Sequence, residues 1–411
     1  MADSKPAAYE GPAAATFAAT VERVRPHTKL IALLSLGHLV IDLNQGSLPA
    51  VLPFLKTAHG LSYAEAATIV LVANLASSVI QPLFGYLSDQ IARRWILPLS
   101  VMLSGIGIAF LGVAPGYTGV LALVLVMGLG VAAWHPEGYK TATGVAGDRK
   151  ATALSWFSLG GNVGIALGPP VITFLITGLA LAGTLGMLAP ALLVSALLLL
   201  ALPRIVHAAT TPRLATATAA RGVNMPGAMA VLIVVVMFRS WTSLGFTTFV
   251  PFYYVDYLHA DPRLVGPLLF VFLGAGALGT VLAGPLADRW GPRVFIKWVF
   301  LAAMPFGLLF LATSGLTAFV MLGLFGAVLT SSFSVSVVLG QAYLPRNSGM
   351  ASGLIVGLSI GMGGLGVTGL GWIADHHGLP MALGISAAMP LLGFIAARFL
   401  PRPRDRDVVT T

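Results

Sequence analysis

A short motif occurs twice in the chain, as Gly85-Tyr86-Leu87-Ser88-Asp89 and as Gly284-Pro285-Leu286-Ala287-Asp288. An arginine follows each copy, at Arg94 and at Arg293, and the shared Gly, Leu, Asp and Arg positions are each 199 residues apart. Each copy ends an apolar run that is long enough to cross a bilayer. The repeat therefore predicts two related halves, as in transporters that are built from parallel repeats.

The composition indicates a membrane protein. Of the 411 residues, 57% are hydrophobic and only 9% are charged, whereas soluble domains carry about 25% charged residues. The apolar runs are continuous and do not alternate with polar residues, which favours transmembrane helices over a β-barrel. The absence of cysteine excludes disulfides and thiol catalysis. The net charge of +9 could suggest a nucleic-acid partner, but the positions of the basic residues favour a membrane protein with no such partner.

The apolar runs predict an all-α protein with twelve transmembrane helices in two six-helix bundles. The expected spans are 30-54, 64-88, 95-113, 118-142, 151-178, 181-202, 225-257, 264-287, 294-313, 317-342, 349-374 and 380-400. The chain then divides into a tail (1-29), a first bundle (30-203), a linker (204-224), a second bundle (225-400) and a second tail (401-411). Residues 1-29 are polar and rich in Ala and Pro, and do not resemble a signal peptide.

The basic residues predict the orientation. With the N-terminus inside, all 23 lysines and arginines fall on the cytoplasmic side except Lys56, Arg263 and Arg239. The first two lie outside, and Arg239 lies within a span. The positive-inside rule therefore predicts a multi-pass protein with both termini in the cytoplasm.

The first span contains an unusual polar stripe. His38, Asp42 and Gln45 fall on one face of a helix, and ionisable groups inside a bilayer face protein or water rather than lipid. A carboxylate in such a place is a candidate for reversible protonation. We expect Asp42 to carry the transported proton, with a static polar interaction as the alternative. His38 either exchanges a proton itself or orients Asp42 by a hydrogen bond.

The fourth span contains a second polar group, His135-Pro136-Glu137. Pro136 removes one backbone hydrogen bond and is expected to kink the helix. Glu137 is a second candidate for proton coupling, although a local ion pair with Lys140 is an equally good interpretation. His135 is a candidate gate or substrate ligand.

Three further residues are candidates for contact with substrate. Arg239 is the one cation expected deep in a span, and a guanidinium binds phosphonate or carboxylate oxygens in a bidentate manner. An ion pair of Arg239 with Asp42 or Glu137 is an equally weighted alternative. Asn162 can reach a cavity or form an interhelical hydrogen bond. Phe246 can line a cavity or serve in packing.

Small residues in the fifth span predict close helix contact. Gly160, Gly164 and Gly168 recur every four residues before Pro169-Pro170, and such a stripe lets two helices approach while the prolines permit a bend. The glycine-rich segments lack the Lys-Ser/Thr ending of a phosphate-binding loop, so ATP is not expected to drive the protein. No nucleophile-base pair indicates an enzyme, and His376-His377 is too weak a signal to predict a metal site.

The repeated motif resembles the signature of the major facilitator superfamily, which also occurs in both halves. It departs from that pattern at Ala92 and Pro292. A narrower resemblance, to the fosmidomycin resistance protein subfamily, covers nearly the whole chain. It is carried by His38-x-x-x-Asp42-x-x-Gln45, Ala76-Ser77-Ser78-x-x-Gln81-Pro82-x-x-Gly85-Tyr86, His135-Pro136-Glu137, Gly160-Gly161-Asn162-x-Gly164-x-x-x-Gly168-Pro169, Gly340-Gln341-x-x-Leu344-Pro345 and Gly361-Met362-Gly363-Gly364-Leu365-Gly366.

The resemblance implies a monomeric, proton-coupled drug exporter of the bacterial inner membrane, with fosmidomycin, a small phosphonate, as the namesake substrate. The proton gradient would supply the energy, with no cofactor. Conformational roles are expected for the motif residues and for the glycines and prolines of two spans, namely Gly85, Asp89, Arg93, Arg94, Gly284, Asp288, Arg293, Pro136, Gly164, Gly168 and Pro169. A proton-coupled importer of a small anionic metabolite and a non-transporting membrane receptor are the alternatives.

Overall fold

The computed structural model describes residues 26–81, 83–84, 94–147, 150–209 and 223–403. Within these ranges the regular structure is entirely helical. The long helices of the first half are α1 (Thr28–His59), α2 (Tyr63–Asn74), α4 (Ile96–Ala109), α5 (Tyr117–Val145), α6 (Lys150–Leu179) and α7 (Leu188–Ala209). Those of the second half are α8 (Pro226–Phe252), α9 (Val265–Trp290), α10 (Pro292–Ala312), α11 (Gly315–Tyr343), α12 (Ser348–Gly353), α13 (Ser359–His377) and α14 (Leu379–Ala397).

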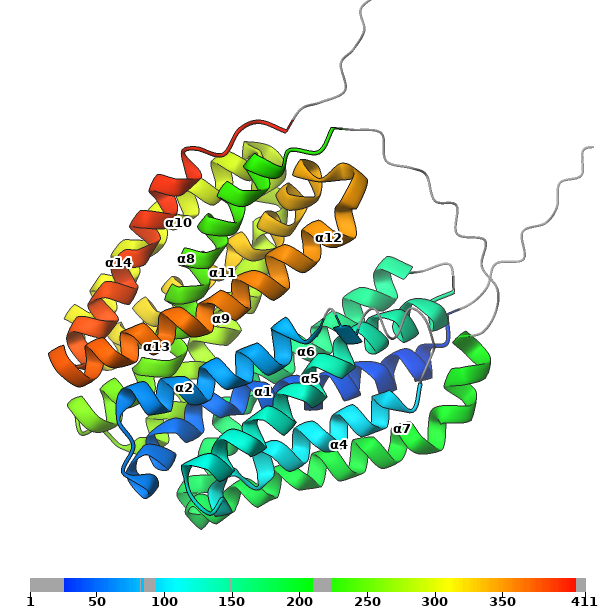
Figure 1. The fold of residues 1–411 in the computed structure, drawn as a ribbon, viewed down its shortest axis with the longest axis horizontal. Coiled ribbons are helices and arrows are strands. Elements are labelled where there is room, and N and C mark those ends of the chain that lie inside the picture. The colour runs from blue at the N-terminus through cyan, green and yellow to red at the C-terminus, as the bar shows by residue number, and fades with distance from the viewer. Residues whose placement is uncertain (1–25, 82, 85–93, 148–149, 210–222, 404–411) are drawn as a thin grey trace, which may run out of the picture.

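Ten helices of the described ranges are long and apolar enough to cross a membrane. The other two predicted spans correspond to the shorter apolar helix Tyr63–Val79 and to α12 and α13, which are joined by a π-helical segment, Leu354–Leu358. With α12 and α13 taken together as one span, the described helices form two groups of six, and the predicted all-α fold is confirmed (Figure 1). The membrane orientation and the predicted tails and linker stay predictions.

The two halves meet along two pairs of helices. Within the first half α1 packs against α6, and α4 packs against α5 and α7; within the second half α11 packs against α9 and α10, and α14 against α8. Between the halves, α2 packs along α13 and α6 along α9. In Figure 1 the halves lie one above the other, with the ends of α2 and α13 close together on the left.

The buried apolar residues show that the two ends of the molecule differ. One core cluster is continuous across both halves and includes Leu55, Leu61, Phe252 and Leu379. At the opposite end each half has a separate cluster, one around Leu34 and Trp134 and one around Leu232 and Phe300. The halves are therefore closed together at one end and have separate cores at the other.

The glycine stripe of α6 explains the close packing of α1 and α6. A methyl group at Gly160 would overlap the carbonyl of Ser35, and one at Gly164 would overlap the carbonyl of Leu39. A methyl group at Gly168 would crowd the carbonyl oxygen of Leu43 at 2.5 Å. The structure thus shows the predicted close contact, while a role of Gly164 and Gly168 in gating stays a prediction.

Candidate functional site

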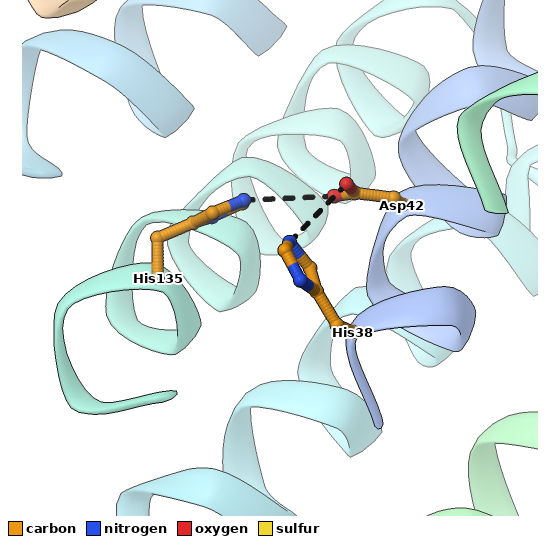
Figure 2. Close-up of side chains that lie close together, drawn as sticks. All are labelled: His38, Asp42 and His135. Atoms are coloured by element: carbon orange, nitrogen blue, oxygen red, sulfur yellow. Dashed lines mark ion pairs between the residues drawn. The ribbon is translucent and has the colours of Figure 1, made fainter. Parts of the chain in front are cut away.

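Two histidines converge on one aspartate inside the first half (Figure 2). His38 and Asp42 lie one turn apart on α1, and the Nε2 atom of His38 is 3.4 Å from Asp42 Oδ2. His135 comes from α5, and its Nε2 atom is 3.6 Å from Asp42 Oδ1. The predicted proximity of His38 and Asp42 is therefore present. His135 joins them, a contact between helices that was not predicted.

Backbone hydrogen bonds fix both imidazole rings. The Nδ1 atom of His38 is 2.8 Å from the carbonyl oxygen of Phe157, and that of His135 is 2.9 Å from the carbonyl oxygen of Val131. A carbonyl oxygen only accepts, so each Nδ1 carries the hydrogen, and the Nε2 atom of a neutral ring is then an acceptor. When both rings are neutral, two acceptor nitrogens therefore face the Asp42 carboxylate.

Burial makes this arrangement costly without a cation. The side chains of His38, Asp42 and His135 are 4%, 13% and 20% exposed, and Asp42 Oδ1 has no hydrogen-bond partner among the described residues. Unsatisfied buried acceptors cost free energy. The cluster therefore favours a positively charged partner, either a proton or a metal ion.

Aromatic side chains enclose His38. Its ring stacks on Phe157 at a centroid distance of 4.3 Å, and the ring of Tyr139 packs edge-on against it. Gly161 on α6 lies against the facing atoms of His38 and Asp42. A methyl group at this position would be 2.5 Å from Asp42 Oδ2 and 2.6 Å from His38 Nε2. Gln45, the third residue of the predicted stripe, is half-buried.

Glu137 has a cationic partner in the turn that precedes α4. Arg94 Nη1 forms a buried ion pair with Glu137 Oε1 and also donates to Thr141 Oγ1 at 2.9 Å. Both charged side chains are at most 9% exposed. A carboxylate neutralised by a guanidinium is suited to a structural role, and Pro136 next to it lies within the uninterrupted helix α5.

Arg239 is a buried cation in the second half. It is 7% exposed, its Nη2 atom donates to Ser240 Oγ at 3.2 Å, and its Cζ atom lies 4.8 Å from the centroid of the Phe333 ring. Its Nε atom is buried without a hydrogen-bond partner, and no described carboxylate forms an ion pair with it. In this structure Arg239 pairs with neither Asp42 nor Glu137.

Phe246 packs in an aromatic cluster in this structure. Phe246 is fully buried, and its ring packs against Phe325 at 4.4 Å and against Phe272 and Phe310 at about 6 Å. Packing of large apolar rings, one of the two interpretations given above, therefore accounts for its position, and contact with substrate stays a prediction. Asn162 is exposed on α6, so it remains available to a ligand or to lipid-facing contacts.

The repeated motif is seen clearly only in its second copy. Gly85, Asp89 and Arg93 lie outside the described residues. Gly284 and Asp288 are exposed on α9, and the Arg293 Nε atom donates to the carbonyl oxygen of Leu400 at 2.8 Å. Arg293 thus binds the end of its own half, and no ion pair joins it to Asp288 among the described residues. The conformational roles expected for these residues stay predictions.

Four residues that the sequence analysis did not connect join the halves at their closed end. We call Lys56, Tyr63, Asp256 and Asp375 the interhalf latch. Lys56 Nζ lies 3.2 Å from Asp256 Oδ2, and the Tyr63 hydroxyl donates to the same oxygen at 3.0 Å. The carboxylate of Asp375 accepts the backbone N–H groups of Tyr63 and Ala64 at 2.7 and 2.9 Å, so it caps the start of α2. Anionic caps are stabilising at helix N-termini.

Comparisons with known proteins agree with this architecture. A sequence model of the Major Facilitator Superfamily matches residues 34–365. The uncharacterized MFS-type transporter YfnC of Bacillus subtilis (strain 168) is 33% identical over 374 residues, 89% of this chain and 91% of that protein. The fosmidomycin resistance protein of Escherichia coli (strain K12) is 31% identical over 395 residues, 95% of this chain and 97% of that protein.

Solved transporters share the fold. A bacterial homologue of the human lysosomal transporter Spinster, in an inward-facing and occupied conformation, superposes with a TM-score of 0.73 at 17% identity, covering 92% of this chain and 97% of that one. The inward-open xylose transporter XylE of E. coli gives a TM-score of 0.68 at 14% identity, with coverage of 92% and 97%. At these identities the likeness concerns the fold alone.

Proposed function

The chain belongs to the Major Facilitator Superfamily, and from that premise we propose that it exports a small anionic compound in exchange for protons. The substrate class we assign is a phosphonate such as fosmidomycin, and the proton gradient supplies the energy. Export takes place across the bacterial inner membrane, with both termini in the cytoplasm.

The buried, unpaired guanidinium of Arg239 carries the assignment of an anionic substrate. A charge in this environment costs several kcal/mol unless a partner offsets it. The described residues offer Arg239 one hydroxyl and one aromatic ring but no carboxylate. A phosphonate would supply two oxygens for bidentate hydrogen bonds to the guanidinium.

The histidine-aspartate cluster supports the assignment of a proton site. A proton on His38, Asp42 or His135 would supply the hydrogen-bond donor that the facing acceptor atoms lack. These three residues all belong to the first half. Arg239 belongs to the second half, and it does not pair with Asp42. Coupling therefore acts through the conformational exchange of the halves, in which each ligand favours the conformation that binds it better.

The difference between the continuous core at one end and the separate cores at the other supports a transport cycle that begins with substrate from the cytoplasm. Under the predicted orientation, the closed end with the interhalf latch faces outward, and the end with two separate cores faces the cytoplasm. Substrate then enters from inside, and protons from outside would load the cluster after the halves exchange. The 31% identity to the fosmidomycin resistance protein supports export rather than import.

Binding of fosmidomycin to purified protein tests the substrate class. Arg239→Met is expected to weaken binding about 10- to 100-fold, because a hydrogen-bonded charge contributes about 1.5–3 kcal/mol. Arg239→Lys keeps the positive charge but not the planar guanidinium that forms bidentate hydrogen bonds, so its loss of affinity should be intermediate. Arg263→Gln, which changes an exposed cation near the closed end, is the matched control. Equal affinity in the wild type and Arg239→Met would contradict the proposal.

Susceptibility of cells tests the direction of transport. Cells that express the wild type should tolerate more fosmidomycin than cells that express Arg239→Met at the same protein level. Unchanged susceptibility to fosmidomycin and to a panel of other small anions would remove drug export as the function.

A further inference from the structure

We propose that His38, Asp42 and His135 form a binding site for a divalent transition-metal ion of the Zn²⁺ type. The ligand atoms of the three side chains all lie within 4.8 Å of one another. Binding of the ion does not depend on the proposed function, and only its consequence for transport rests on that function.

The residue types match the chemistry of such an ion. Zn²⁺ binds imidazole nitrogen and carboxylate oxygen, and sites with three protein ligands leave a position for water. Imidazole ligands favour transition metals over Mg²⁺ and Ca²⁺, which prefer oxygen. Two imidazoles and one carboxylate therefore indicate a borderline-soft ion rather than a hard one.

The distances fit a metal better than direct hydrogen bonds. Each Nε2 atom is 3.4 or 3.6 Å from a carboxylate oxygen, which is beyond the usual range for an N–H···O bond. Around a tetrahedral ion with bonds of about 2.0–2.1 Å, neighbouring ligand atoms lie about 3.4 Å apart. The two contacts are close to this spacing, although they involve different oxygens of Asp42. The three ligand atoms lie within 4.8 Å of one another, so the side chains would draw closer together around a bound ion.

The hydrogen bonds behind the ligands prepare both rings for a metal. Metal-binding histidines donate their other ring N–H to a carbonyl or carboxylate, which fixes the ring and turns the free lone pair to the ion. His38 does so to Phe157 and His135 to Val131. The buried, unbonded Oδ1 atom of Asp42 completes the set of available lone pairs.

His376, in the last turn of α13, provides a contrast. The Nδ1 atom of His376 also lies 2.8 Å from a carbonyl oxygen four residues earlier, that of Trp372. Its ring stacks on Trp372 at the surface, and no described carboxylate forms an ion pair with it. His376 therefore shares the backbone bond of His135 but lacks the converging ligands, which makes it a matched control.

Gly161 allows the site to be tested without removal of a ligand. A methyl group at this position would press on Asp42 Oδ2 and His38 Nε2. Gly161→Ala must therefore displace two of the three ligands, although it removes none of the donor atoms. A metal site with fixed geometry is expected to lose affinity from such a change.

Titration of the purified, metal-free full-length protein with Zn²⁺, and with Co²⁺ as a spectroscopic probe, tests the inference. One ion should bind per chain, and Co²⁺ should show the visible spectrum of nitrogen and oxygen ligands. His135→Gln and Asp42→Asn should each weaken binding at least about 10-fold, since loss of an outer hydrogen-bond partner alone costs about 10- to 100-fold. Gly161→Ala should also weaken it, whereas His376→Gln should bind as the wild type does.

Two results would overturn the inference. One is a Zn²⁺ affinity of folded His135→Gln and Gly161→Ala that equals the affinity of the wild type. The other is loss of Zn²⁺ binding in His376→Gln. Each variant is checked for a single, monodisperse species before titration. Fosmidomycin binding is measured on the same samples, so the two proposals fail separately. If the proposed function also holds, Zn²⁺ should inhibit proton-driven transport by the wild type, and Gly161→Ala should need at least about 10-fold more Zn²⁺ for the same inhibition.

Discussion

Lys56, at the end of α1, forms an ion pair with Asp256, which follows α8, and this contact links the first half of the molecule to the second. The Tyr63 hydroxyl binds the same carboxylate, and Asp375 caps α2 from the other half. These polar contacts lie at the end where the apolar core is continuous. Any conformation that opens this end must break them.

Weakening the interhalf latch should shift the conformational equilibrium. Asp256→Asn removes the charge that Lys56 and Tyr63 both contact, and a partly exposed ion pair contributes up to about 1 kcal/mol. The population open at this end should therefore rise about 5-fold. The chain contains no cysteine, so spin labels on Ala58→Cys and Leu258→Cys report the distance between the halves without background labelling.

Asp261→Asn is the control for this measurement. Asp261 also lies near the closed end, but its side chain binds the backbone N–H of Arg263 within its own half. It should leave the distance distribution unchanged. An unchanged distribution in Asp256→Asn would show that the latch does not contribute to closure.

Substitution of the glycines of α6 should change stability differently from one position to another, because only some of them contact α1. Gly164→Ala forces a methyl group against the backbone of α1, which cannot move cheaply, and overpacking costs about 1–3 kcal/mol. Gly178→Ala, in the same helix, meets no atom within 4 Å and should be neutral or stabilising by up to about 1 kcal/mol. Thermal unfolding in detergent compares the two. Equal unfolding temperatures would contradict the packing described for α1 and α6.

The ion pair of Arg94 and Glu137 predicts that Glu137 has a structural role rather than a role in proton coupling. Glu137→Gln leaves a buried guanidinium without its carboxylate, so the free energy of unfolding should fall by about 3–5 kcal/mol. The double variant Arg94→Gln, Glu137→Gln should lose less than the sum of the single variants. Additive losses, or loss of proton-driven transport with unchanged stability, would favour proton coupling at Glu137 instead.

The sequence was sufficient to predict features that depend on one helix or on the whole composition. The spans, the shared face of His38 and Asp42, and the small-residue face of Gly164 all follow from helical periodicity and apolar length. The internal repeat, with its spacing of 199 residues, supplied the division into two related halves.

Contacts between helices that are far apart in the sequence could not be predicted from helical periodicity and apolar length. Tyr63 and Asp375 are 312 residues apart, and nothing in either local pattern specifies the partner. His135 was a candidate gate or substrate ligand. Its contact with Asp42 was not predicted, because helix periodicity alone does not tell which face of α5 meets α1. Phe246 lies in a span rich in aromatic residues, where packing and cavity-lining positions have the same local pattern.

Transport into proteoliposomes tests the central claim of proton-coupled anion exchange most directly. With an acidic interior, an antiporter accumulates labelled fosmidomycin as protons leave, whichever way the protein is inserted. The account predicts accumulation with the wild type, none with Asp42→Asn, and preserved fosmidomycin binding by folded Asp42→Asn. Accumulation only with an alkaline interior would indicate proton-coupled import, and unchanged accumulation in Asp42→Asn would contradict the assignment of the proton site.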